Sequence, residues 1–206
     1  MEPLIHGILL AFGLILPLGV QNVFVFNQGA THKKFTNALP AVITAGLCDT
    51  LLIYLAVAGV SLIVFSFEWL KILLFLVGFF FLTYMGWVIW KDQPEVSTDS
   101  DRKHFSARRQ ITFAASVSLL NPHAILDTIG VIGTSSLAYN GYDKWAFMLA
   151  CIAVSWVWFI SLAIVGRKIG QIDGTGNLLK YINQISAIII WIMAIYMGYQ
   201  LYGLLK

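Results

Sequence analysis

The chain has 206 residues, of which 59% are hydrophobic and only 11% are charged, and its mean hydropathy is +0.80. A soluble domain covers its core with charged residues, and this composition supplies too few of them. The composition therefore excludes a globular cytosolic enzyme, a disordered tail, a disulfide-rich scaffold and a protein that binds nucleic acid. The net charge of +3 comes from 13 Lys and Arg against 10 Asp and Glu, which lie mostly between apolar runs.

Six apolar runs are long enough to cross the hydrocarbon core of a bilayer, which takes roughly 20 helical residues. Backbone polar groups find no water in lipid, so each run is predicted to be helical. The sequence thus predicts an all-α membrane protein with six transmembrane helices. In chain order the runs cover about residues 3–31, 39–65, 69–90, 111–138, 145–166 and 181–205.

Positively charged residues are concentrated in alternate loops. Ten of the 13 Lys and Arg residues lie in the first, third and fifth of the predicted loops. Short loops rich in Lys and Arg stay in the cytoplasm. These three loops are therefore predicted to be cytoplasmic, with both termini on the opposite side of the plasma membrane.

A polar segment, residues 91–109, divides the six predicted helices into two groups of three. We predict a first three-helix repeat at 1–90, a cytoplasmic linker at 91–109 and a second three-helix repeat at 110–206. Because each group has an odd number of helices, the two groups would cross the membrane in opposite orientations. Inverted repeats of this kind are typical of secondary transporters.

The first helix of each predicted repeat is interrupted by proline. Pro17 and Gly19 interrupt the first run, and the sequence Asn121-Pro122-His123 interrupts the fourth. Proline lacks a backbone donor and clashes with the preceding turn, so we predict helices broken at Pro17 and at Pro122. Matching breaks in two repeats point to a transporter binding site where the repeats meet, whereas one break alone would indicate only a kink.

Polar side chains follow each break, and two carboxylic acids lie in otherwise uncharged runs. A charged group at the centre of a membrane costs about 2.5 to 3.5 kcal/mol, so such acids indicate a function; the alternative is an acid that ties helices together by hydrogen bonds. The candidate residues for binding substrate or protons are Gln21, Asn22, Asp49, Asn121 and Asp127, with Asn27, Gln28 and His123 as secondary candidates.

The charges in the apolar runs indicate the kind of substrate. No Lys or Arg accompanies Asp49 or Asp127 deep in a predicted helix, so the site is expected to attract a cation or protons. Free N–H groups after each proline would attract a carboxylate. An α-amino acid with a cationic side chain satisfies both features, although charge alone does not separate lysine, arginine and a polyamine.

We expect no metal site and no cofactor. Cys48 and Cys151 lie in separate apolar runs, with no CxxC pattern and no nearby His. Isolated cysteines of this kind usually behave as small buried hydrophobic residues.

Three segments of the chain resemble the lysine exporter (LysE) family, and its branch of lysine and arginine exporters in particular. They are ILPLGVQNVFVFNQGA at 15–30, LCDTLLI at 47–53 and LLNPHAILDTIGVIG at 119–133. The resemblance extends over nearly the whole chain and implies export of L-arginine or L-lysine. It also implies a part in export for the residues that match these segments, namely Gln21, Asn22, Asp49, Asn121, Pro122 and Asp127.

Export of a cation needs an energy source, because moving one positive charge outward costs about 2.3 kcal/mol per 100 mV of membrane potential. We therefore expect a proton antiporter with alternating access, whose partners are a cationic amino acid, protons and the lipid bilayer. Small-residue helix faces are compatible with a homodimer. The alternatives are export of another small amino acid such as homoserine or threonine, an intramembrane aspartyl enzyme, and a scaffold that transports nothing.

Overall fold

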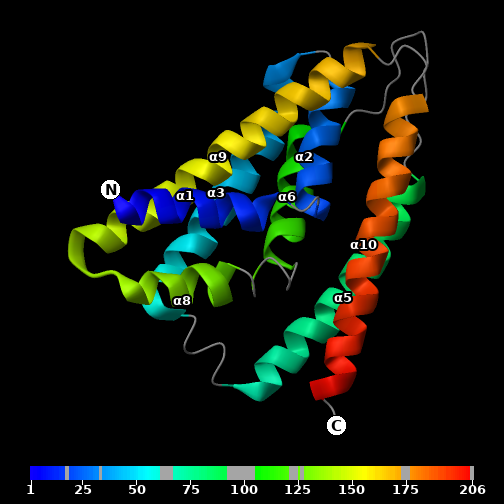
Figure 1. Cartoon of the computed structure of the whole chain (residues 1–206). Coiled ribbons are helices and arrows are strands. Elements are labelled where there is room, and N and C mark those ends of the chain that lie inside the picture. The colour runs from blue at the N-terminus through cyan, green and yellow to red at the C-terminus, as the bar shows by residue number, and fades with distance from the viewer. Residues whose placement is uncertain are drawn as a thin grey trace.

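The structure is a computed structural model that describes residues 1–16, 19–32, 34–60, 67–91, 105–120, 125, 128–172 and 177–204. Every regular element in these ranges is helical (Figure 1). In chain order the elements are α1 (Glu2–Ile15), α2 (Val20–Thr31), η1 (Phe35–Asn37), α3 (Leu39–Leu55), η2 (Ala56–Val60), α5 (Glu68–Lys91), α6 (Ala107–Leu119), η3 (Thr128–Ile132), α8 (Gly133–Ser135), η4 (Ser136–Ala138), α9 (Gly141–Ile172) and α10 (Asn177–Leu204).

Three helices of the described chain are long and apolar enough to cross a membrane by themselves. They are the continuous helix Leu39–Gly59, the helix α9, and Lys180–Gly203 of α10. The pair α1 and α2 passes the same test as one bent unit, which brings the number of candidate spans to four at most. The apolar stretches Phe75–Lys91 and Thr128–Ala138 are shorter. The protein is thus an all-helical membrane protein with three or four candidate spans in its described residues.

The first predicted run is broken where its proline lies. Helix α1 ends at Ile15, α2 begins at Val20, and the two axes differ in direction by 81°. Gly19 caps α2 in an extended conformation. The predicted break is confirmed by these two helix ends, although Pro17 itself lies outside the described residues.

The fourth predicted run is also interrupted. Helix α6 ends at Leu119, before Pro122, and the next element whose bounds the structure describes is the π-helical turn η3, which begins at Thr128. Asn121, Pro122, His123 and Asp127 lie outside the described residues.

The fifth run is longer than its apolar residues suggest. Helix α9 covers Gly141–Ile172 and so extends past both ends of the predicted 145–166. The extensions contain Asp143, Lys144 and Arg167, which break the apolar pattern. A helix need not end where its apolar residues end, because its charged turns lie in the polar interface of the membrane.

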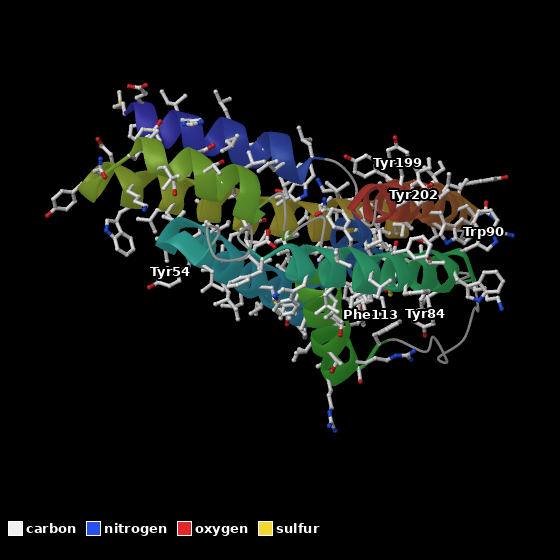
Figure 2. The ribbon with its side chains drawn as sticks, turned by 90° about the horizontal axis from the view of Figure 1, so that it is seen from below. Tyr54, Tyr84, Trp90, Phe113, Tyr199 and Tyr202 are labelled. Carbon is white, nitrogen blue, oxygen red and sulfur yellow. The ribbon has the colours of Figure 1, made fainter. Side chains whose placement is uncertain are left out.

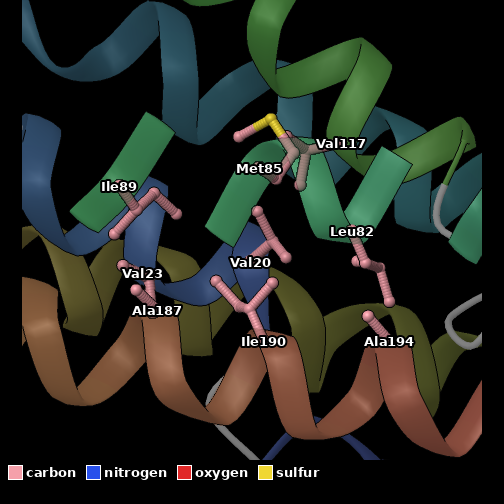
Figure 3. Close-up of a cluster of buried hydrophobic side chains, with 9 residues drawn as sticks. All are labelled: Val20, Val23, Leu82, Met85, Ile89, Val117, Ala187, Ile190 and Ala194. Atoms are coloured by element: carbon pink, nitrogen blue, oxygen red, sulfur yellow. The ribbon is translucent and has the colours of Figure 1, made fainter. Parts of the chain in front are cut away.

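Helix α2 is the centre of the molecule, because ten of its residues are buried. It packs against α9, α3, α6 and α10. On one side, Val20 and Val23 join a cluster that α5, α6 and α10 complete (Figure 3). The pair α5 and α10 runs side by side along one edge of the molecule, and α1 lies along α9 (Figure 1).

Glycines bring α2 into direct backbone contact with α9. A Cβ atom on Gly29 would collide with the carbonyl oxygen of Ala163, and one on Gly166 would collide with the carbonyl oxygen of Phe26. Gly170 is one turn beyond Gly166 and meets the next turn of α2 in the same way. Small residues at such a spacing allow two membrane helices to approach closely.

The outer surface carries apolar and aromatic side chains, as expected for a surface that faces lipid. Tyr54, Tyr84 and Tyr199 point away from the helices (Figure 2) and are about half or more exposed, at 48%, 64% and 74%. Aromatic residues with a polar end favour the boundary between lipid and water.

Candidate functional site

Asp49 lies on the inner side of α3. Each residue turns a helix by about 100°, so the exposed residues of α3 lie roughly 120–160° around the axis from Asp49. These exposed residues are Ile43, Leu47, Leu51 and Tyr54. The residues that share the side of Asp49 are almost completely buried, namely Val42, Ala45, Ile53 and Ala56. Asp49 therefore faces the other helices and not the outer surface of α3.

Side chains from two other helices hydrogen-bond the carboxyl group of Asp49. Gln21 of α2 donates a hydrogen bond from Nε2 to Asp49 Oδ1 at 3.1 Å, and Ser155 of α9 hydrogen-bonds the same carboxyl group. Gln21 and Ser155 are buried, whereas Asp49 is only half-buried. Because Asp49 faces inward, the part of it that stays accessible must face the space between the helices.

The electrostatic environment of Asp49 has a helix end but no cation among the described residues. In the part of the chain that the structure describes, no Lys, Arg or His pairs with this carboxyl group. Its partner Gln21 belongs to the first turn of α2, whose N-cap Gly19 supplies no side-chain hydrogen bond. The positive end of a helix stabilises a nearby negative charge. The hydrogen bond from Gln21 thus places the start of a helix beside Asp49.

Asn22, also predicted to bind substrate, holds the bend between α1 and α2. Its Nδ2 donates to the carbonyl oxygen of Ile15 at 2.8 Å, which satisfies an acceptor at the end of α1. Its Oδ1 accepts from Nε1 of Trp158 at 3.3 Å. Asn22 therefore connects α1, α2 and α9 at the point where the first run changes direction.

We predict that replacing Asn22 with Ala destabilises this bend. The change leaves the Ile15 carbonyl and the Trp158 indole without these partners, and an unpaired buried polar group costs about 1–3 kcal/mol. The expected result is a lower melting temperature of the purified protein in detergent. Thr83→Val on α5 is the control, because the Thr83 hydroxyl is exposed and donates within its own helix, to the carbonyl oxygen of Phe79. Equal melting temperatures for the Asn22 variant and the unaltered protein would contradict this role.

The two secondary candidates on α2 have different surroundings. Asn27 donates from Nδ2 to Oδ1 of Asn183 on α10 at 2.7 Å, and both residues are buried. Gln28 is 4% exposed, and its Oε1 has no hydrogen-bond partner within the described part of the chain. The structure thus brings Gln21 and Asp49 together, directs Asn27 to another helix, and leaves the Gln28 oxygen unpaired.

Two residues near the site are not predicted from the sequence. Ser155 and Trp158 lie in the apolar run of α9, where one of two Ser residues and one of three Trp residues carry no distinctive pattern. Their helix runs beside α2. Only this packing identifies them, because the sequence does not say which faces of distant helices meet.

The comparisons with known proteins agree with this picture. Residues 12–201 match the family model described as LysE type translocator. The protein named "Putative amino-acid transporter YisU" from Bacillus subtilis (strain 168) is 60% identical over 98% of this chain and 91% of its own length.

More distant relatives carry a more specific name. The Arginine exporter protein ArgO of Serratia proteamaculans (strain 568) is 30% identical over 95% of this chain and 96% of its own length. The protein of the same name from Shigella flexneri is 29% identical over 92% of this chain and 90% of its own length. No solved structure matches the chain.

The resemblance predicted from three sequence segments is confirmed by the family match, which covers all three. The chain therefore belongs to the LysE type translocator family, which makes it a multi-pass membrane translocator of amino acids and not an intramembrane enzyme or a scaffold.

Proposed function

We propose that this translocator exports cationic amino acids, L-arginine, L-lysine or both, across the plasma membrane in exchange for protons. The observation that carries the proposal is the half-buried carboxyl group of Asp49, which faces the other helices and has no cationic partner among the described residues. A guanidinium or ammonium group of the substrate would supply the missing counter-ion. The relatives named as arginine exporters support this specificity.

The first turn of α2 would bind the other end of the substrate. Its N–H groups have no side-chain cap, and Gln21 holds this turn beside Asp49. A helix start of this kind attracts a carboxylate, which every amino acid carries. A cationic amino acid would then contact α2 through its carboxylate and Asp49 through its side chain. Arginine would gain most, because a guanidinium can form two parallel hydrogen bonds with one carboxylate.

The proposed architecture is that of two inverted repeats, residues 1–90 and 110–206, joined by a cytoplasmic linker at 91–109, with six crossings and both termini outside the cell. The interruption of the first run after Ile15 and of the fourth run after Leu119 supports it, because each interruption falls within the first run of its repeat. In this arrangement Asn121 and Asp127 of the second repeat complete the site that Gln21 and Asp49 begin.

Proton exchange would provide the energy for export. Moving a cationic substrate outward against an inside-negative potential costs about 2.3 kcal/mol per 100 mV for each charge. A proton that enters the cell in exchange carries one positive charge inward and so offsets this cost. We propose that Asp49 and Asp127 alternate between a proton from outside and the substrate cation from inside, while the two repeats rock against each other.

We predict that the purified protein in proteoliposomes transports labelled L-arginine or L-lysine but not L-threonine or L-glutamate. Transport is expected to be driven by an imposed pH gradient and to stop when the gradient is collapsed by an ionophore. The measurement is uptake of the labelled amino acid from the outer solution into vesicles whose interior has the higher proton concentration. Transport of threonine alone would replace this proposal by the alternative of a neutral amino-acid exporter.

A further inference from the structure

Two buried glutamine side chains on different helices have side-chain oxygens that find no hydrogen-bond partner among the residues that the structure describes. They are Gln28 of α2, 4% exposed, and Gln110 of α6, 1% exposed. A buried polar group without a partner is costly, and most buried polar groups in proteins are paired. Two such oxygens on neighbouring helices therefore suggest a binding site whose ligand supplies the missing hydrogen bonds.

Contacts on either side of Gln28 place its turn of α2 beside α6. One turn before Gln28, the ring of Phe24 lies against the ring of Phe113, with centroids 4.3 Å apart. One turn after Gln28, His32 Nε2 lies 3.0 Å from Gln110 Nε2. Residues four apart share one face of a helix. Gln28 is thus level with the turn of α6 that separates Gln110 from Phe113.

The Gln110 amide has a defined orientation. Its Nε2 donates to the carbonyl oxygens of Asn37 at 2.9 Å and Phe105 at 3.0 Å. These contacts require the nitrogen on that side, so the unpaired atom is the carbonyl-type oxygen, which can only accept a hydrogen bond. The missing ligand must therefore bring an N–H or O–H donor, and an anion would be repelled.

We propose that Gln28 and Gln110 form a second binding station, which accepts the ammonium group of the transported amino acid. An ammonium is a compact donor with three N–H groups, and every amino acid carries one. The proposal rests on the translocation of amino acids that the family carries out, and it does not depend on the cationic specificity or proton coupling proposed above.

Along α2, Phe24 lies between the residue that binds Asp49 and the residue of the second station. Gln21, which binds Asp49, precedes Phe24 by about one turn, and Gln28 follows it by one turn. The Phe24 ring also packs near Phe105, with centroids 6.0 Å apart. An amino acid that moves along α2 would therefore pass from one polar station to the other by displacing the Phe24 ring.

The test is the variant Gln28→Met in the full-length protein purified in detergent. The ligand probe is a labelled mixture of the twenty common amino acids, from which the retained ones are identified by chromatography. Methionine nearly matches glutamine in shape and removes the unpaired amide. We expect affinity for the retained amino acid to fall about 5- to 10-fold, while the melting temperature stays the same or rises. Unchanged affinity would overturn the proposal.

A second comparison tests the ammonium assignment. The 2-hydroxy acid that corresponds to the retained amino acid lacks the ammonium group. It should compete poorly for binding to the unaltered protein, and Gln28→Met should reduce its affinity less than it reduces the affinity of the amino acid. Gln28→Glu supplies a stronger acceptor and is expected to retain binding. If Gln28→Glu weakens binding as much as Gln28→Met, the ammonium assignment is wrong.

The control is Gln171→Met, the same substitution at an exposed position near the end of α9. It is expected to leave affinity unchanged, and a loss equal to that of Gln28→Met would overturn the proposal. Retention of threonine in place of arginine or lysine would contradict the proposed cationic specificity. The second station would still be supported in that case if Gln28→Met weakened the binding of threonine.

Discussion

Replacing Asp49 with Asn is expected to reduce transport of the cationic amino acid about 10- to 100-fold. Asparagine has nearly the shape of aspartate and its Oδ1 can still accept the hydrogen bond from Gln21, so the helices should keep their packing. What is lost is the negative charge. A hydrogen bond to a charged group contributes roughly 1.5–3 kcal/mol, and each 1.4 kcal/mol is a factor of ten in affinity.

The measurement for Asp49→Asn is transport of labelled arginine and lysine in proteoliposomes with an imposed pH gradient. The melting temperature is expected to stay the same or rise, because the folded protein no longer has to desolvate a carboxylate. Asp143→Asn is the matched control, since Asp143 is exposed in the first turn of α9. Transport by the Asp49 variant at the rate of the unaltered protein would show that Asp49 has only a structural role.

Replacing Gly166 with Ala is expected to destabilise the protein by about 1–3 kcal/mol, the usual cost of an oversized side chain in a packed interior. The added methyl group would collide with the carbonyl oxygen of Phe26, which is part of the α2 backbone and cannot rotate away. Helices α2 and α9 would have to separate. For a chain of this size we expect the melting temperature to fall by roughly 2–12 °C.

The same substitution at Gly13 is the control, because a Cβ atom there meets no atom within 4 Å. Gly13→Ala should leave the melting temperature unchanged or raise it slightly, since alanine favours helix. Gly166→Ala should also reduce transport, because Gln21 on α2 and Ser155 on α9 must reach the same carboxyl group. Equal stability of the two variants would mean that α2 and α9 do not pack as closely as described.

The sequence predicted the helical class, the family and the break in the first run for clear physical reasons. Lipid offers no hydrogen bonds to a backbone, so a long apolar run must be helical. Proline cannot continue a helix, so Pro17 indicates where α1 and α2 divide. The hydrogen bond from Gln21 to Asp49 is one of the contacts that the sequence offered for an acid that ties helices together, which was the alternative to an acid that binds substrate.

The length of the spans shows the limits of composition. Charged residues at both ends of α9 ended the predicted run, yet the helix continues through them. Helix α5, in contrast, covers Glu68–Lys91 and so agrees with the predicted run 69–90 at both ends. Hydropathy records which residues prefer lipid, and helix ends depend also on caps and on packing.

What the sequence determined by itself is which segments are apolar, where prolines interrupt them and which polar groups lie inside them. What only the tertiary structure decided is which of those polar groups are already paired. Asn22 and Asn27 resemble Gln21 and Gln28 in the sequence, but the two asparagines bond to Ile15 and Asn183 and Gln21 bonds to Asp49. The Gln28 oxygen has no partner in the described ranges. A hydrogen bond depends on the distance between side chains from different helices, and that distance is set by how the helices pack and not by their order in the chain.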